Sequence, residues 1–60
     1  MKELMQMIGK RGYINVNGWI VALEVTDVKK VFGHEKLECT QPLSNVRQWI
    51  NRESFIEVAS

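Results

Sequence analysis

The stretch from Gly12 to Val25, GYINVNGWIVALEV, decides the fold because it contains the clearest turn signal in the chain. At its centre stands Asn17-Gly18, and these two residue types best tolerate the positive φ angles that a type I′ turn requires at both central positions. The stretch therefore predicts a β-hairpin with a tight turn. Such a turn sets a register with two apolar pairs, namely Val16 opposite Trp19 and Ile14 opposite Val21.

The alternation of apolar residues supports this register. Because successive side chains of a strand point to opposite faces, Leu23 and Val25 lie on the same face as Val21. The opposite face carries a mixture of residue types. A helix over Trp19–Val25 is the alternative, but the segment follows a tight turn and is rich in β-branched residues, which favours a strand.

The second strand continues beyond Val25 with a change of phase. Val28 is apolar at a position where the alternation predicts a polar side chain. One extra residue near Thr26-Asp27, a β-bulge, reconciles the two phases and bends the strand sharply. A small barrel needs such a bend to close.

A second hairpin is predicted from the polar run Gly33–Lys36, which contains a glycine and follows the segment VKKVF. A loop of these four residues pairs Phe32 with Leu37. The returning strand then runs from Leu37 to Thr40, with Leu37 and Cys39 on the inner face.

Two further short strands are predicted after this hairpin. Pro42 cannot donate a ladder hydrogen bond, so Gln41–Asn45 separates the strands. Val46–Ile50 and Phe55–Val58 read as strands. Between them, the segment from Asn51 to Ser54 predicts a single helical or 3₁₀ turn with Asn51 as its N-cap.

The N-terminal segment Met1–Ile8 is rich in helix-forming residues, and Leu4 and Ile8 share one face of a short helix. Gly9 is a plausible residue to end that helix. A helix of this length depends on packing. Two interpretations follow: the segment caps one open end of the β core, or its methionines form an adaptable docking surface for a partner or a second copy.

Length and composition indicate one domain, residues 1–60, with an N-terminal cap segment at 1–11 and the β structure at 12–58. The net charge of +1 argues against a strong nonspecific polyanion binder. A single cysteine, Cys39, excludes an internal disulfide framework, and Cys39 with His34 offers too few ligands for structural zinc. We therefore expect no metal, no cofactor and a reducing cytoplasm. We expect no membrane contact, because no apolar run is long enough to cross a bilayer and no signal peptide is visible.

The predicted pattern of five short strands, a bent second strand and a single turn before a short last strand resembles an SH3-like small β-barrel. The segments that carry the resemblance are Gly12–Val25, Val28–Thr40 and Gln48–Val58, so it covers residues 12–58 at the level of architecture. KOW-type modules are similar in the first hairpin but usually hold more glycine, and an OB-type barrel normally needs a longer chain. The resemblance implies an all-β, five-stranded barrel. SH3-like barrels of bacteria and their phages often bind nucleic acid or serve as assembly modules, although fold does not determine function.

The sequence contains no convincing set of catalytic residues, and we expect a protein that is not an enzyme. His34 beside Glu35 could form an acid–base pair, but a surface turn supplies neither a pocket nor a substrate-facing partner. Cys39 is predicted on an inward position, where a free cysteine acts as a small hydrophobic residue rather than as a reactive thiol.

The aromatic residues allow two interpretations. Aromatics interleaved with lysine and arginine on a barrel surface would form a platform on which bases stack. A domain this small also needs its large side chains in the core. We therefore predict Trp19, Phe32 and Phe55 inside, and Tyr13 and Trp49 partly exposed. Lys29-Lys30 suits a solvated edge that discourages strand pairing.

Two binding hypotheses remain. The first is a protein-interaction or self-assembly module whose partner-binding residues are Leu4, Met5, Ile8 and Trp49. The second is a nucleic-acid-binding barrel that uses a basic and aromatic face of Lys10, Arg11, Tyr13, Lys29, Lys30 and Arg47. The net charge near zero favours the first hypothesis, and the fold resemblance favours the second.

Overall fold

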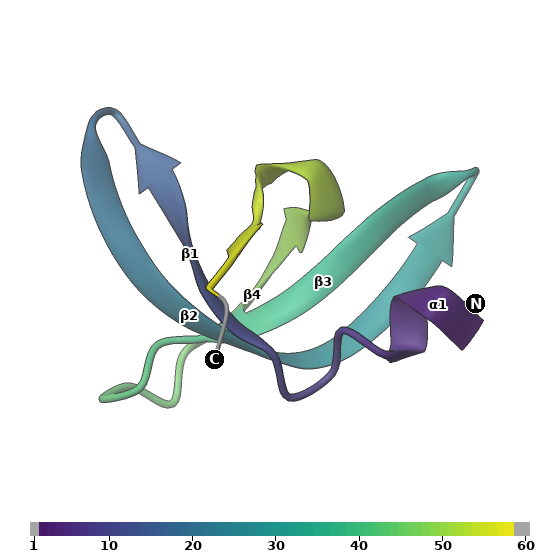
Figure 1. The fold of residues 1–60 in the computed structure, drawn as a ribbon, viewed down its shortest axis with the longest axis horizontal. Helices are drawn as coiled ribbons and strands as arrows, with labels where there is room; N and C mark the ends of the chain where they lie inside the picture. The colour runs from purple at the N-terminus through teal and green to yellow at the C-terminus, as the bar shows by residue number, and fades with distance from the viewer. Residues whose placement is uncertain (1, 59–60) are drawn as a thin grey trace.

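A computed structural model describes residues 2–58 and shows one five-stranded antiparallel sheet with a short helix at the N-terminus (Figure 1). Met1, Ala59 and Ser60, which the predicted domain includes, lie outside the described residues. The elements in chain order are α1 (Lys2–Met5), β1 (Arg11–Val16), β2 (Trp19–Val31), β3 (His34–Thr40), β4 (Arg47–Asn51), the 3₁₀ turn η1 (Arg52–Ser54) and β5 (Ile56–Glu57). The all-β fold class is thus confirmed.

The first hairpin has the predicted turn and register. Asn17 and Gly18 have φ angles of 52° and 88°, as a type I′ turn requires. Val16 pairs with Trp19 and Ile14 with Val21. The side chain of Asn15 adds a local bond, because its Oδ1 accepts a hydrogen bond of 2.9 Å from the N–H of Gly18.

The predicted bulge is present in the middle of β2. The pairing of β2 with β3 shifts register between Val25 and Asp27. Thr26, the residue between them, donates from its hydroxyl to the backbone carbonyl of Glu38 at 3.2 Å and to the Glu38 carboxylate at 3.0 Å. Asp27 Oδ1 accepts a hydrogen bond of 2.8 Å from the N–H of Val28. The extra residue therefore finds hydrogen-bond partners, and β2 curves from one hairpin to the other (Figure 1).

The second hairpin differs from the prediction of a four-residue loop with Phe32 opposite Leu37. Its turn is Phe32-Gly33, with φ angles of 50° and 82°, and it pairs Val31 with His34 and Val28 with Leu37. Phe32 adopts the left-handed conformation that asparagine adopts in the first turn. Since a bulky residue rarely does so, the sequence suggested a longer loop. His34, Glu35 and Lys36 consequently belong to β3.

The C-terminal elements follow the predicted order with shifted boundaries. β4 begins at Arg47 and ends at Asn51, and β5 covers only Ile56–Glu57. The predicted side-chain cap by Asn51 is wrong: Asn51 has extended backbone angles at the start of η1, but its side chain makes no capping hydrogen bond. Its Oδ1 instead accepts a hydrogen bond from Nζ of Lys36, on the neighbouring strand.

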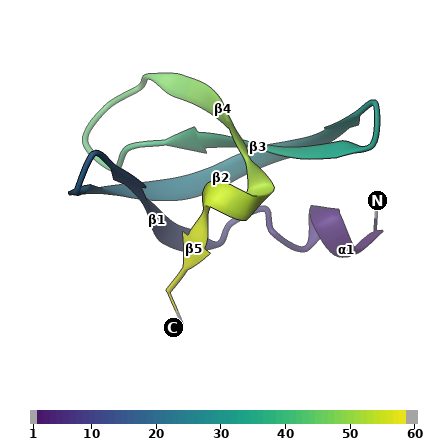
Figure 2. The same ribbon diagram turned by 90° about the horizontal axis from the view of Figure 1, so that it is seen from above.

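The sheet order is β4-β3-β2-β1-β5. The chain passes from β4 through η1 to β5, at the other end of this order, and Figure 2 shows η1 joining the two strands on one side of the molecule. The sheet curves around the core but does not close, since β4 pairs only with β3 and β5 only with β1. This open five-stranded arrangement is compatible with a small SH3-like barrel.

The core is small and entirely apolar among the described residues. Leu37 and Cys39 of β3 are 0% exposed, which confirms their predicted inward positions. Phe55, immediately before β5, is buried as predicted. In the part of the chain that the structure describes, the buried hydrophobic residues are Leu4, Ile14, Leu23, Val25, Val28, Leu37, Cys39 and Phe55.

The N-terminal segment packs onto this core, as the cap interpretation expects. Leu4 of α1 is 2% exposed and belongs to the core cluster, and Met7 packs against it. The helix is shorter than the predicted Met1–Ile8. The chain after it is bound to β2, because the N–H of Gly9 donates to the carbonyl of Val25 at 2.8 Å and the N–H of Val25 donates to the carbonyl of Lys10 at 2.9 Å.

Two of the three aromatic residues predicted inside are exposed. Trp19 is 77% and Phe32 97% exposed. Both stand at hairpin turns, where the strands extend past the core. Tyr13 is half-buried and Trp49 is 39% exposed, so the prediction of partial exposure is confirmed for both.

Gly12→Ala is predicted to destabilise the fold. A Cβ at this position would overlap the carbonyl oxygen of Ile56 and the ring of Phe55, and such overpacking costs about 1–3 kcal/mol. Urea denaturation followed by circular dichroism measures the change. Ile20→Ala, at an exposed position of the same hairpin, is the control and should change stability by less than about 0.5 kcal/mol. Equal midpoints for the two variants would refute the tight contact between β1 and the C-terminal segment.

Candidate functional site

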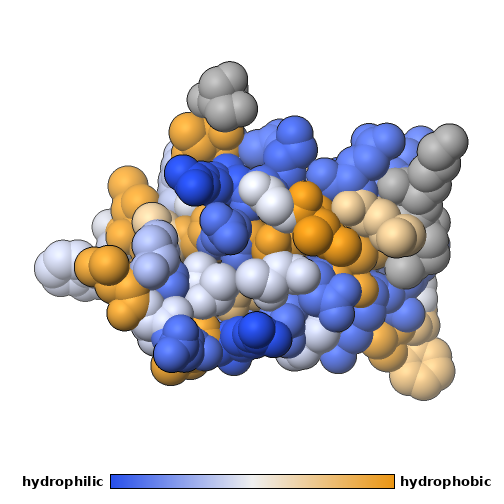
Figure 3. Space-filling model, turned by 90° about the horizontal axis from the view of Figure 1, so that it is seen from below, coloured by the Kyte–Doolittle hydropathy of each residue, from blue (hydrophilic) through white to orange (hydrophobic). Residues whose placement is uncertain are grey.

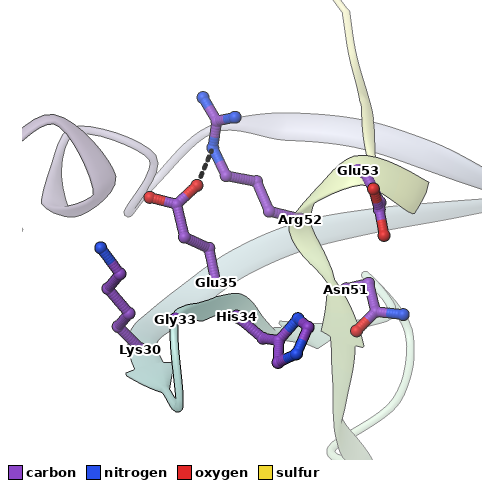
Figure 4. Close-up of a pocket in the computed structure, with 7 residues that line it drawn as sticks. All are labelled: Lys30, Gly33, His34, Glu35, Asn51, Arg52 and Glu53. Carbon is purple, nitrogen blue, oxygen red and sulfur yellow. Dashed lines mark ion pairs between the residues drawn. The ribbon is translucent and has the colours of Figure 1, made fainter.

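A polar pocket of about 320 Å³ lies between the second hairpin and η1. Lys30, Gly33, His34, Glu35, Asn51, Arg52 and Glu53 line it. Figure 4 shows Glu35 directed toward Arg52 and His34 directed toward Asn51, as expected for consecutive residues of a strand. The acid–base pair of His34 and Glu35 that the sequence suggested is therefore not assembled.

The charges of this pocket largely offset one another. Arg52 forms an ion pair with Glu35 at 3.7 Å, and Lys30 is the cross-strand partner of Glu35. Both members of the ion pair are about half exposed, and exposed pairs of this kind contribute up to about 1 kcal/mol. The arrangement holds η1 to β3.

Burial makes the thiol of Cys39 unreactive. Its side chain lies in the core, and desolvation, with a smaller contribution from the Glu38 carboxylate, raises the pKa of the Cys39 thiol above its ordinary value of 9.0. A thiol held in its protonated form is a poor nucleophile and metal ligand. Within residues 2–58 no group of three or more histidine, cysteine, aspartate or glutamate side chains is placed to hold a metal ion.

Most of the basic residues predicted to contact nucleic acid have a carboxylate partner. Lys10 Nζ lies 3.6 Å from Glu57, Arg11 Nε lies 3.5 Å from Glu24, and Arg47 Nη1 lies 3.9 Å from Glu38. These carboxylates lower the positive potential that a phosphate backbone would meet. The predicted register of the first hairpin already places Arg11 opposite Glu24, whereas the pairs of Lys10 and Arg47 join segments whose register the sequence did not predict.

The predicted basic and aromatic face forms only in part. The strand register places Arg11, Tyr13, Lys29 and Arg47 on the solvent face of the sheet, with Glu24 and Glu38 between them. Lys30 lies on the opposite face, in the polar pocket, and Lys10 precedes β1.

The structure adds one basic and aromatic contact within this face. Lys29 Nζ lies 4.2 Å from the centre of the Trp49 ring, a cation–π contact. Lys36, which the sequence interpretation omitted, is the direct neighbour of Lys29 across β2 and β3. Lys29, Lys36 and Trp49 therefore form the most basic part of the solvent face.

The predicted partner-binding residues do not form one surface. Leu4 is buried in the core, so its side chain is not available to a partner. Met5 and Ile8 are 56% and 44% exposed on the N-terminal segment. Trp49 lies on β4, which β3 and β2 separate from β1 in the sheet. The ammonium group of Lys29 lies over the Trp49 ring.

Another group of exposed apolar side chains lies at the end of the first hairpin. Val16, Trp19 and Ile20 are 45%, 77% and 69% exposed. We call these three residues the hairpin tip. Beside it, an apolar groove of about 380 Å³ runs between β2 and the loop 41–46, lined by Ile20, Val21, Ala22, Gln41, Pro42 and Leu43.

Sequence reasoning placed Val16 and Trp19 correctly on one face but assumed that the core covers the whole of it. The small size of the chain could have indicated this exposure, because so few residues cannot bury the inner face along all six paired residues of both strands. Figure 3 shows one face of the molecule, on which apolar residues form separate groups divided by hydrophilic ones.

Comparisons of the chain with protein-family models, with curated proteins and with solved structures gave no match. Among the described residues, no helix has the length and apolar character needed to cross a bilayer.

Leu4→Ala is predicted to lower the free energy of unfolding, because Leu4 is part of the core and not of a free partner-binding surface. Removing a buried leucine side chain costs about 2–5 kcal/mol, while Met5→Ala, at an exposed position one residue along, should cost less than about 0.5 kcal/mol. Thermal unfolding of both variants measures the difference. A Leu4→Ala protein as stable as the Met5→Ala protein would show that α1 does not pack on the core.

Cys39 is predicted to resist thiol reagents until the chain unfolds. In native buffer the wild-type protein should react slowly, and in urea at the rate of a free thiol.

The raised pKa of the Cys39 thiol also makes the stability of the fold depend on pH. As the pH rises, the thiol of the unfolded chain loses its proton at a lower pH than the thiol of the folded protein. Stability from this group is therefore complete below pH 9.0 and declines as the pH rises above it. Cys39→Ala lacks this decline; equal alkaline slopes for both proteins would contradict the prediction.

Proposed function

We propose that this chain is a non-enzymatic, SH3-like module that binds another protein through the hairpin tip. The observation that carries the proposal is the exposure of Trp19, at 77%, with the exposed Val16 opposite it on the same face and the exposed Ile20 on the other face of the hairpin. Exposing large apolar surface to water is unfavourable. Tryptophan is also enriched among the residues that dominate binding energy at protein interfaces.

The charge distribution of the hairpin favours a protein partner over nucleic acid. No charged residue occurs from Gly12 to Leu23, so the whole end of the hairpin is neutral. Binding to phosphate backbones depends on lysine and arginine, whereas the centre of a protein interface is depleted of charge and enriched in aromatic residues. The partner we infer is therefore a protein surface with an apolar pocket.

The strand order and the 3₁₀ turn before the last strand support the resemblance to SH3-like barrels, and that resemblance implies a binding role. We further propose a cytoplasmic location, because the lone cysteine is a buried free thiol that suits a reducing compartment.

Nucleic-acid binding is the second candidate, and the stacking of Lys29 on Trp49 favours it. Trp49 is partly exposed, with Lys36 nearby on the same solvent face. The ion pairs of Arg11 and Arg47 with glutamate weaken this candidate.

A photo-reactive amino acid at position 19 tests the first proposal in cells that produce the protein. We expect a discrete covalent adduct from position 19 that survives nuclease treatment. Phe32 is the matched control, because it is also an exposed aromatic at a hairpin turn but lies at the other end of β2. No adduct at position 19, equal adducts at both positions, or an adduct removed by nuclease would overturn the proposal.

A further inference from the structure

The open sheet leaves strand edges that differ in how they are protected. An unpaired edge exposes backbone N–H and C=O groups that can pair with another strand. The β5 edge is only two residues long. The part of β2 from Asp27 to Val31 has a strand partner on one side only, and Asp27, Lys29 and Lys30 supply charge there. Short length and charge are the usual protections of such edges.

β4 lacks these protections. It runs for five residues, its one charged side chain is at its first position, and it contains no proline. Gln48, Trp49 and Ile50 form an uncharged centre. Within residues 2–58 the whole of its outer edge is unpaired, since β4 ends the sheet order and pairs only with β3.

The Trp49 ring is drawn away from this edge. Its cation–π partner, Lys29, belongs to β2, and β3 lies between β2 and β4 in the sheet. Lys29 Nζ and the Trp49 ring, 4.2 Å apart, therefore meet across β3, on the side of β4 away from its free edge. The large side chain of β4 thus leaves the backbone of the strand accessible.

We propose that β4 pairs with β4 of a second copy of this chain, antiparallel and about a two-fold axis at Trp49. The two sheets then form one continuous sheet across the axis. This partner goes beyond the protein partner of the hairpin tip, because β4 and β1–β2 are separated by β3.

The side chains of β4 tolerate this register. Arg47 lies opposite Asn51 of the second copy, Gln48 lies opposite Ile50, and Trp49 meets Trp49. No two like charges face each other, which matters because directly opposed like charges destabilise a strand pair. A cationic side chain instead meets an amide that can accept a hydrogen bond. A two-fold interface uses the same surface on both subunits, so a strand that can face itself without charge repulsion suits such a dimer.

A pair of five-residue strands is a small interface compared with the 1,200–2,000 Å² typical of stable complexes. We therefore expect weak association, seen as a rise in mass at high protein concentration by sedimentation equilibrium. Trp49→Lys places two lysines opposite each other on the axis and should abolish the rise. Trp19→Lys, at the hairpin tip, should leave it unchanged. Loss in the second variant alone would assign self-association to the hairpin tip and overturn the β4 proposal.

Engineered cysteines test the register directly. Side chains directly opposite in an antiparallel pair have Cβ atoms about 4.5–5.5 Å apart, near disulfide range, so Trp49→Cys should cross-link at least about tenfold more than Arg47→Cys under mild oxidation. Arg47→Cys is the matched control, because it is exposed on the same strand and the same face but does not meet itself.

An equimolar mixture of Arg47→Cys and Asn51→Cys proteins should cross-link to each other, because these positions are opposed in the proposed register. The buried native Cys39 does not compete. Equal cross-linking of Trp49→Cys and Arg47→Cys, or a monomeric mass at all concentrations with no Trp49→Cys cross-link, would overturn the proposal.

Discussion

The rest of the structure depends on one constraint, which is that β2 must pair with two different hairpin partners. Its first half pairs with β1 and its second half with β3, and the two ladders meet at Glu24. A straight strand would leave both ladders in one flat layer with nothing to enclose. The extra residue at Thr26 bends the strand and changes its phase, so that Leu23, Val25 and Val28 all turn inward. One bulge thus gives the sheet both its curvature and its core.

The small size of this core explains where the surface features lie. A short sheet can cover its inner face only near the bend of β2, and there Leu4 from α1 and Phe55 close the two sides. Residues farther along either hairpin leave the core, whatever their polarity. This is why Trp19 and Phe32 stand in solvent while the much smaller Cys39 is fully buried.

The sequence was informative where local chemistry and apolar pattern agreed. Asn17-Gly18 predicted a turn and a register, and the phase change at Val28 predicted the bulge. Phe32-Gly33 forms the same kind of turn, but no local rule favours phenylalanine at φ 50°. Among the site residues, the pairing of Arg11 with Glu24 follows from the predicted hairpin register, whereas the pairs of Lys10 with Glu57 and of Arg47 with Glu38 could not be predicted, because no local turn sets the pairing of those segments.

The pairing of β5 with Gly12 and Tyr13 has a consequence for how the protein is made. Phe55 and β5 leave the ribosome after all the other core residues, yet they complete the packing around Gly12. Until then the two hairpins can form locally, but the core remains open to water on one side. Domains generally fold as units during synthesis, and in this chain the final step waits for the last strand. A pause in translation before Phe55 would therefore prolong the exposure of Leu23 and Leu37 to chaperones and to proteases.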